Sequence, residues 1–125
     1  MGFLIVFLGG GFGAALRHGV NLLSARMLGV AFPYATAFEN VSGSLVMGLL
    51  AGYFAFRGGG MPSHLQLFLT TGILGGYTTF SAFSLDAVLL YERGALALAA
   101  LYVLSSVVLS IGGLMAGLAL ARQVF

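Results

Sequence analysis

Long stretches without a charged side chain constrain this chain more than any other feature of its sequence. Residues 1–16, 40–56, 58–85 and 94–121 contain no Asp, Glu, Lys or Arg. Charged residues make up 6% of the 125 positions, whereas an average globular protein has roughly 25%. Such a chain cannot cover a surface that faces water, and a helix of roughly 20 apolar residues is long enough to cross a bilayer. The sequence therefore predicts an integral membrane protein.

Turn-forming residues divide the chain into four predicted spans. The first ends before Gly29 and Pro33, and the second ends at Arg57 and the glycines that follow it. Ser63 is a plausible N-cap for the third span. We expect one all-α domain over residues 1–125, and its four transmembrane helices are predicted at about residues 2–24, 34–56, 63–90 and 95–121.

Composition excludes several classes of protein. The chain has no cysteine, which rules out a disulfide scaffold and a thiol enzyme. Its five arginines are scattered singly, whereas nucleic-acid binding needs basic residues clustered on a solvated face. These absences argue against thiol chemistry and against a nucleic-acid partner, and we also expect a membrane protein that is not an enzyme.

The arginines outside the predicted spans give almost no instruction about orientation. Arg57 and Arg122 lie on the side of the termini, and Arg26 and Arg93 lie on the other side. The positive-inside rule sets orientation by the difference in Lys and Arg between the two sides, and here each side has two arginines. Either a lipid environment or a partner decides the orientation, or the chain inserts both ways and pairs antiparallel with itself.

Each predicted span also carries one Gly-x-x-x-Gly motif. Small residues at this spacing let membrane helices approach closely. The motifs favour tight packing on several faces and, with it, an oligomer. They begin at Gly9, Gly48, Gly72 and Gly113.

Two charged residues fall inside predicted spans, where an unpaired ion is costly. Arg17 is in the first span and Glu39 in the second, at similar depth if the two helices are antiparallel neighbours. One interpretation is a structural ion pair. The other is an anion-attracting vestibule at Arg17 and a cation or proton site at Glu39.

The third span contains a stretch that disfavours helix near its middle. Gly75-Gly76 is followed by Tyr77 and two β-branched threonines, Thr78 and Thr79. A break there would free backbone carbonyls and amides, and broken membrane helices commonly form ion sites.

Two phenylalanines follow this stretch at a spacing that puts them on one helix face. Phe80 and Phe83 project the positive edges of their rings. Such edges could face a small anion, although from the spacing alone plain packing is the commoner explanation of two phenylalanines in a membrane helix.

Polar side chains also follow helical spacing on the second and fourth spans. Asn40 and Ser44 share one face, and a lone membrane asparagine commonly makes an interhelical hydrogen bond. Tyr102, Ser106 and Ser110 put one hydroxyl per turn along about 12 Å of helix. These serines either bond their own i−4 carbonyls or form a polar track beside a narrow aqueous path.

Three segments together resemble the Fluc or CrcB family of small fluoride channels. Residues 75–84, Gly-Gly-Tyr-Thr-Thr-Phe-Ser-Ala-Phe-Ser, resemble its signature. Residues 9–17 are similar to its first-span motif of glycines followed by arginine. Residues 36–44 are similar to its second-span motif, a threonine followed four residues later by asparagine. The resemblance covers nearly the whole chain.

The resemblance implies an antiparallel, dual-topology homodimer in the plasma (inner) membrane, with two pores that export fluoride passively from the cytoplasm. It implies a structural Na⁺ at the dimer centre, held by the backbone carbonyls of Gly75 and Thr78. Asp86 matches a position where the family usually has glutamate near the pore. The fluoride-pore residues that it implies are Arg17, Asn40, Thr79, Phe80, Ser81, Phe83, Tyr102, Ser106 and Ser110.

Some positions depart from the family, and two rival functions remain open. Ala82 replaces the usual threonine, and Tyr77 and Glu39 stand where small or apolar residues are expected. A small four-helix proton-coupled multidrug transporter needs a carboxylate in its first span, where this chain has Arg17 and no acid. A non-transporting assembly subunit would explain the glycine motifs but not the phenylalanine pair.

Overall fold

The computed structural model describes residues 1–57 and 60–125, which form long helices joined by short connections. Helix α1 covers Gly2–Leu28, α2 covers Tyr34–Arg57 and α6 covers Leu96–Val124. The all-α prediction is confirmed. Helix α1 ends about one turn beyond the predicted position. The glycines at 58 and 59, with which the second span was predicted to end, lie outside the described residues.

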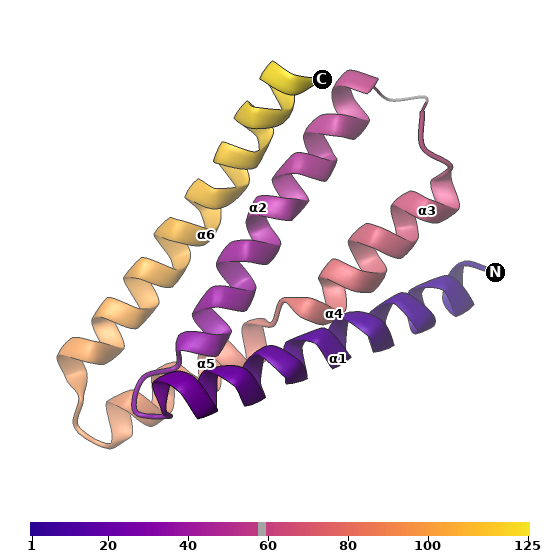
Figure 1. The fold of residues 1–125 in the computed structure, drawn as a ribbon. Coiled ribbons are helices and arrows are strands. Elements are labelled where there is room, and N and C mark those ends of the chain that lie inside the picture. The colour runs from indigo at the N-terminus through magenta and orange to yellow at the C-terminus, as the bar shows by residue number, and fades with distance from the viewer. Residues whose placement is uncertain (58–59) are drawn as a thin grey trace.

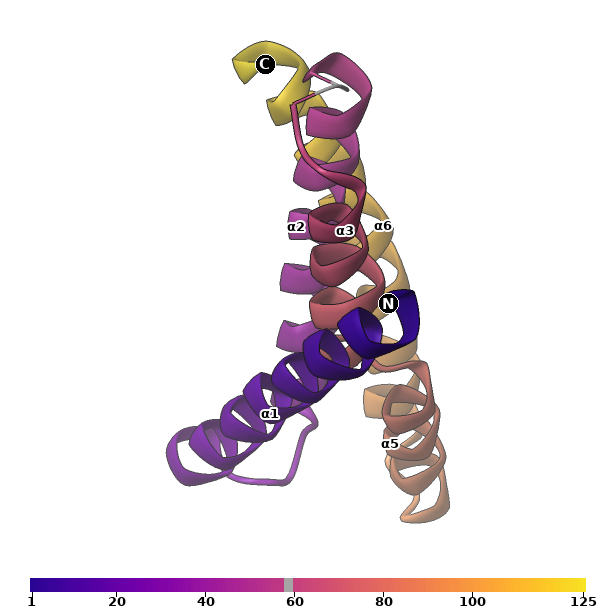
Figure 2. The same ribbon diagram turned by 90° about the vertical axis from the view of Figure 1, so that its right-hand side faces the viewer.

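The chain passes back and forth along the molecule (Figure 1). Helices α2 and α6 lie side by side and run in the same direction, so the C-terminus lies beside the end of α2, whereas the N-terminus lies at the side of the molecule near α3. The α1–α2 and α5–α6 connections lie at the opposite end, where the Arg93 guanidinium donates a hydrogen bond to the Ala31 carbonyl. Figure 2 shows α1 and α5 diverging toward this end.

Within residues 1–57 and 60–125, three helical segments are long and apolar enough to cross a membrane: Gly2–Leu28, Ser63–Glu92 and Leu96–Val124. Many large apolar side chains on them are exposed, as suits helices surrounded by lipid. The more polar α2, with 24 residues, is not among the three. A membrane-embedded helical protein is therefore supported, and the fourth span stays a prediction.

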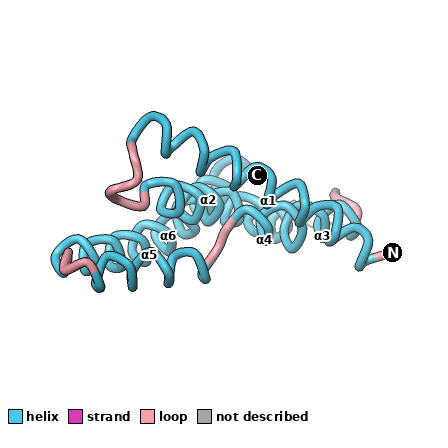
Figure 3. Tube along the Cα trace, turned by 90° about the horizontal axis from the view of Figure 1, so that it is seen from below, coloured by secondary structure: helices cyan, strands magenta, loops and turns pink. Residues whose placement is uncertain are grey.

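The third segment consists of four pieces. Helix α3 (Ser63–Leu67) continues into η1 (Phe68–Leu74), which has π-helical hydrogen bonding, and then into α4 (Gly75–Tyr77). A short loop separates α4 from α5 (Phe80–Glu92) (Figure 3). The predicted break in the third helix is confirmed, whereas the π-helical stretch before it was not predicted.

The break falls on the two threonines and not on the glycines before them. Thr78 has φ −86° and ψ 154°, and Thr79 has φ −152° and ψ 122°. This extended backbone suits β-branched residues. Gly75 and Gly76 stay helical, and Gly76 packs against the Gly10 carbonyl of α1 so closely that a Cβ would overlap it.

The Gly-x-x-x-Gly motifs of α1 and the third segment pack against each other within one chain. A Cβ added to Gly9 would lie 2.9 Å from the Gly72 Cα, and one added to Gly13 would overlap the Ile73 carbonyl. The motifs of α2 and α6 meet in the same way, since a Cβ on Gly117 would overlap the Leu45 carbonyl. These motifs explain the intramolecular fold and are no argument for an oligomer.

Candidate functional site

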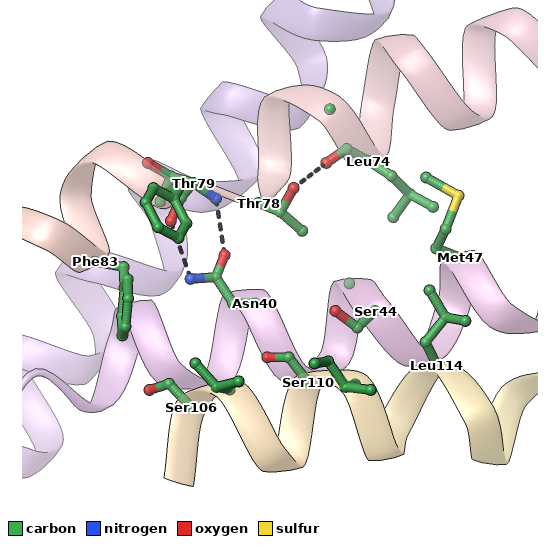
Figure 4. A pocket seen from close by; sticks show the side chains of 15 residues that line it. Asn40, Ser44, Met47, Leu74, Thr78, Thr79, Phe83, Ser106, Ser110 and Leu114 are labelled. Atoms are coloured by element: carbon green, nitrogen blue, oxygen red, sulfur yellow. Dashed lines mark hydrogen bonds between the residues drawn. The ribbon is translucent and has the colours of Figure 1, made fainter. Parts of the chain in front are cut away.

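A cavity of about 440 Å³ lies between α2, the break and α6 (Figure 4). It brings together residues of five elements, α2, η1, α4, α5 and α6, and the two threonines of the loop between α4 and α5. Of the residues that the sequence predicted for a pore or an ion site, those that line it are Asn40, Gly75, Thr78, Thr79, Phe80, Phe83, Ser106 and Ser110.

Asn40 holds the break in its extended conformation. Its Nδ2 donates to the Thr79 carbonyl at 3.0 Å, and its Oδ1 accepts from the Thr79 amide at 2.8 Å. Thr79 in turn caps α5, because its Oγ1 accepts from the Ala82 amide at 3.2 Å. An interhelical hydrogen bond was one expectation for Asn40, and the structure shows two. Asn40 also lines the cavity.

The break removes the helical donors of two backbone carbonyls. In an unbroken α-helix the Gly75 carbonyl would accept from Thr79, and the Thr78 carbonyl would accept from Ala82. Both amides are used elsewhere, by Asn40 and by the Thr79 side chain. The Thr78 hydroxyl does not take the place of these amide donors, because it donates to the Leu74 carbonyl at 2.9 Å. The carbonyls of Gly75 and Thr78, two residues that line the cavity, thereby lose the amide donors that an unbroken helix would give them.

The two phenylalanines differ sharply in burial. Their ring centroids are 5.5 Å apart and the rings are inclined by 52°. Phe83 is 8% exposed and packs on the Tyr102 ring at 5.2 Å between centroids, whereas Phe80 is 78% exposed. Phe83 is therefore both core and cavity wall, and Phe80 lies at the open side of the site.

The predicted hydroxyl track on α6 is divided between two environments. Ser106 and Ser110 line the cavity (Figure 4). Among the described residues the buried Ser106 hydroxyl has no hydrogen-bond partner, so it does not bond its own i−4 carbonyl. Tyr102 is fully buried, does not line the cavity and donates its hydroxyl to Asp86 at 3.0 Å.

Arg17 and Glu39 do not form the ion pair that was one interpretation of the sequence. Arg17 Nε donates to the Gly76 carbonyl at 3.1 Å, which places the guanidinium against α4. Glu39 is 1% exposed, and neither carboxyl oxygen has a hydrogen-bond partner in the described part of the chain. The helix break supplies Arg17 with a free carbonyl, which accounts for this choice of partner. Ser81 is exposed, with its hydroxyl 3.4 Å from that of Thr79.

Two features of the site were missed at the sequence level. One is the apolar half of the cavity wall, which includes Leu74, Met47 and Leu114. The spacing of Asn40, Ser44 and Met47 on one helix face is a signal that could have found the methionine. The other is a hydrogen bond of 3.0 Å between the hydroxyls of Tyr77 and Ser42. It gives the unexpected tyrosine a role in joining α4 to α2.

The helices and the cavity define a class: a small helical membrane protein with a broken helix beside a cavity that is lined by both polar and apolar side chains. Comparison with known proteins identifies the family. The family described as "CrcB-like protein, Camphor Resistance (CrcB)" matches residues 4–118. The chain belongs to this family.

Close relatives match over almost their full length. A protein of Rhodopseudomonas palustris (strain BisB5) named "Fluoride-specific ion channel FluC" is 72% identical, over 99% of both chains. "Fluoride-specific ion channel FluC 2" of Nitrobacter hamburgensis is 61% identical, over 98% of both. A "Fluoride-specific ion channel FluC" of Methylobacterium nodulans is 64% identical, over 96% of this chain and 95% of its own.

Proposed function

We propose that this protein is a fluoride-selective ion channel that lets fluoride leave the cytoplasm passively, down its electrochemical gradient. The observation that carries the proposal is the cavity at the helix break, in a chain whose relatives are named fluoride-specific ion channels. Its wall combines amide and hydroxyl donors with aromatic rings. An anion that leaves water needs such replacement partners.

Two kinds of group in the cavity suit a small anion. The Ser106 hydroxyl is a buried donor without a partner among the described residues, and Asn40 uses one of its two amide hydrogens on Thr79. The phenylalanine pair adds ring edges, which carry partial positive charge. In this proposal fluoride passes from the donors of Asn40, Ser106 and Ser110 to the rings of Phe80 and Phe83.

The remaining predicted pore residues act at the margins of this path. Arg17, whose Nε donates to the Gly76 carbonyl, adds positive charge beside α4 and attracts the anion. Thr79 and Ser81 offer hydroxyls where α5 begins. Tyr102, which is buried and does not line the cavity, packs against the Phe83 ring and donates a hydrogen bond to Asp86, and so supports the wall of this path.

We propose that the functional unit is an antiparallel homodimer with two pores, in the plasma (inner) membrane. Phe80 supports this, because a path walled by both rings needs a second surface over a side chain that is 78% exposed on one chain. The balance of arginines supports insertion in both orientations. Epitope tags at the C-terminus should be accessible from both faces of the membrane, and a tag found on one face alone would exclude dual topology.

The freed carbonyls suit a structural Na⁺ at the centre of that dimer. Unwound backbone carbonyls in membrane helices are ligands for Na⁺. Gly75 and Thr78 each present one, because the amides that would occupy them bond elsewhere. Two chains would together offer four such oxygens, and the ion would stabilise the broken helices against each other.

The rival function, a proton-coupled multidrug transporter, has little support. Its chemistry needs an acid on the first helix, and the charged residues of α1 are Arg17 and Arg26. The cavity also lacks an acidic side chain among its lining residues.

Anion efflux from liposomes that hold the purified protein tests the channel directly. We expect fluoride release without chloride release, at a rate proportional to the protein added. Protein-free liposomes give the background leak. The absence of fluoride flux, or transport of a cationic dye in exchange for protons, would contradict the proposal and favour the rival.

A further inference from the structure

Glu39 is a buried carboxyl group for which the channel proposal has no use. It is 1% exposed, which makes it one of the two largest fully buried side chains among the described residues. Neither of its carboxyl oxygens has a hydrogen-bond partner in that part of the chain. Because one chain alone buries the group, a second copy has no surface of Glu39 to contact. Its environment is therefore set by this chain's own elements.

The charged groups that act on Glu39 do not pair with it. Arg17 on α1 acts on it from a distance, but its Nε is bonded to the Gly76 carbonyl. Asp86 on α5 adds a like charge and accepts the hydrogen bond of Tyr102 on α6. Tyr102 is itself fully buried, and its hydroxyl is bonded to Asp86 and not to Glu39. No element packed around Glu39 offers its carboxylate a hydrogen-bond donor in the described structure.

The fourth neighbouring element, α4, contributes the hydroxyl of Tyr77. This hydroxyl is 3.0 Å from that of Ser42, on the turn of α2 after Glu39, and so has its own partner. A carboxylate left without donors in an apolar interior is far costlier than a neutral carboxylic acid. The protein therefore holds Glu39 in its protonated form when a proton is available.

Glu39 also lies beside the proposed fluoride path. It directly precedes Asn40, the residue that holds the break and lines the cavity. Tyr102, the other of the two largest fully buried side chains, packs its ring against Phe83 at 5.2 Å between centroids. A negative charge at this place repels an anion in the cavity, and the repulsion is strong where water does not screen it. The charge state of Glu39 therefore matters for an anion that passes Asn40 and Phe83.

We propose that Glu39 is a proton-binding site, and that the protein conducts fluoride while Glu39 holds its proton and conducts less when the proton is lost. The second half of this inference rests on the proposed channel function. The first half, the proton site itself, does not. Glu39→Gln keeps the shape of the protonated side chain and removes the titration. Glu92→Gln removes an exposed acid at the end of α5 and is the matched control.

Infrared difference spectroscopy on the reconstituted protein tests the proton site without any flux. Between about pH 6 and about pH 9 we expect a carbonyl band of a protonated carboxylic acid to disappear in the wild type and in Glu92→Gln. The same band should be missing from Glu39→Gln at every pH. A band that persists in Glu39→Gln, or a wild type without one, overturns the proton site. If Glu39→Gln does not reconstitute, Glu39→Met replaces it.

Fluoride efflux over the same pH range tests the consequence, with the leak of protein-free liposomes subtracted at each pH. We expect wild-type flux to fall by at least about threefold toward alkaline pH and Glu39→Gln to keep the acidic rate throughout. The same pH dependence in wild type and Glu39→Gln, or a flat wild-type profile, overturns the coupling. A wild type that conducts no fluoride at any pH overturns the channel proposal instead, and the infrared result then decides the proton site alone.

Discussion

Asn40 of α2 bonds to both backbone groups of Thr79, the residue at which the third helix is interrupted. The amide donates to the Thr79 carbonyl at 3.0 Å and accepts from the Thr79 amide at 2.8 Å. One side chain thus replaces the backbone partners that the break takes away, as a membrane interior requires. The same residue is part of the cavity wall. The integrity of the break and the lining of the cavity therefore depend on one position.

Replacing Asn40 by alanine should damage stability and transport together. Asn40→Ala leaves the amide and carbonyl of Thr79 without partners, and we expect a loss of about 2 kcal/mol or more in the free energy of unfolding. We also expect fluoride flux to fall at least about tenfold, since the loss of the clamp lets the break rearrange. Unfolding in detergent micelles and liposome efflux measure the two effects.

Asn21→Ala is the matched control for this substitution, because Asn21 is exposed on α1. It should behave like the wild type in both assays. Equal behaviour of Asn40→Ala and Asn21→Ala would refute the role given to the clamp.

The sequence carried enough information to predict the break and the polar side of the cavity, but not their details. Poor helix formers predicted an interruption within residues 75–79, and the structure puts it at Thr78 and Thr79. The exact position depends on Asn40, which is 39 residues away in sequence. Local helix propensity contains no information about a hydrogen-bond partner so far away in the sequence. The partner of Arg17 also depends on the break, because its Nε donates to the Gly76 carbonyl and not to the carboxylate of Glu39.

The glycine motifs illustrate a different limit. Their spacing correctly indicates close packing, but it does not say whether the neighbouring helix belongs to the same chain or to another. The structure shows that Gly9 and Gly13 meet η1 and α4 of the same chain. The apolar half of the cavity was hidden for a related reason, since apolar residues fill every helix of this sequence. Only the tertiary arrangement selects the few that face the site.

The close approach of α1 and η1 predicts opposite effects for two glycines on one helix. A Cβ at Gly13 would overlap the Ile73 carbonyl, whereas a Cβ at Gly11 meets nothing within 4 Å. We expect Gly13→Ala to cost about 1–3 kcal/mol in the free energy of unfolding. Gly11→Ala should be neutral or stabilise the protein by about 0.5–1 kcal/mol, as alanine favours helix. The free energies of unfolding of both variants, measured in the same detergent, test this prediction. Equal destabilisation of the two would contradict the close approach of α1 and η1 at Gly13.

Substitutions of Phe80 and Phe83 should distinguish the contribution of the rings to packing from their contribution to ion recognition. Phe80 is exposed on the single chain, so Phe80→Ile should leave its stability nearly unchanged. Phe83→Ile removes a buried ring from Tyr102 and should cost about 1 kcal/mol or more. If ring edges face the anion, we expect the fluoride flux to be at least about tenfold lower in both variants than in the wild type. Phe3→Ile, on the exposed surface of α1, is the control. Full flux in both site variants would show that the rings only pack.

Ser106 offers a case in which stability and function should move in opposite directions. Its hydroxyl is buried with no partner in the described structure. Ser106→Ala removes an unsatisfied polar group, and we expect stability to rise by about 1 kcal/mol. Fluoride flux should fall, because the cavity loses a free donor. Ser105→Ala is the neighbouring control, since Ser105 bonds the Tyr102 carbonyl at 3.4 Å. A less stable Ser106→Ala with unchanged flux would mean that the hydroxyl has a structural partner instead.

Removal of Na⁺ should weaken the protein if the freed carbonyls of Gly75 and Thr78 hold this ion. Without it these oxygens lack the amide donors of an unbroken helix in a membrane interior, which is costly. We expect the dimer to dissociate more readily, and fluoride flux to fall, when Na⁺ is replaced on both sides by a bulky organic cation. Restored Na⁺ should recover both properties in a saturable way, while K⁺ at the same ionic strength provides the control for screening. Equal dimer stability and equal flux in Na⁺ and in the organic cation would rule out a structural sodium site.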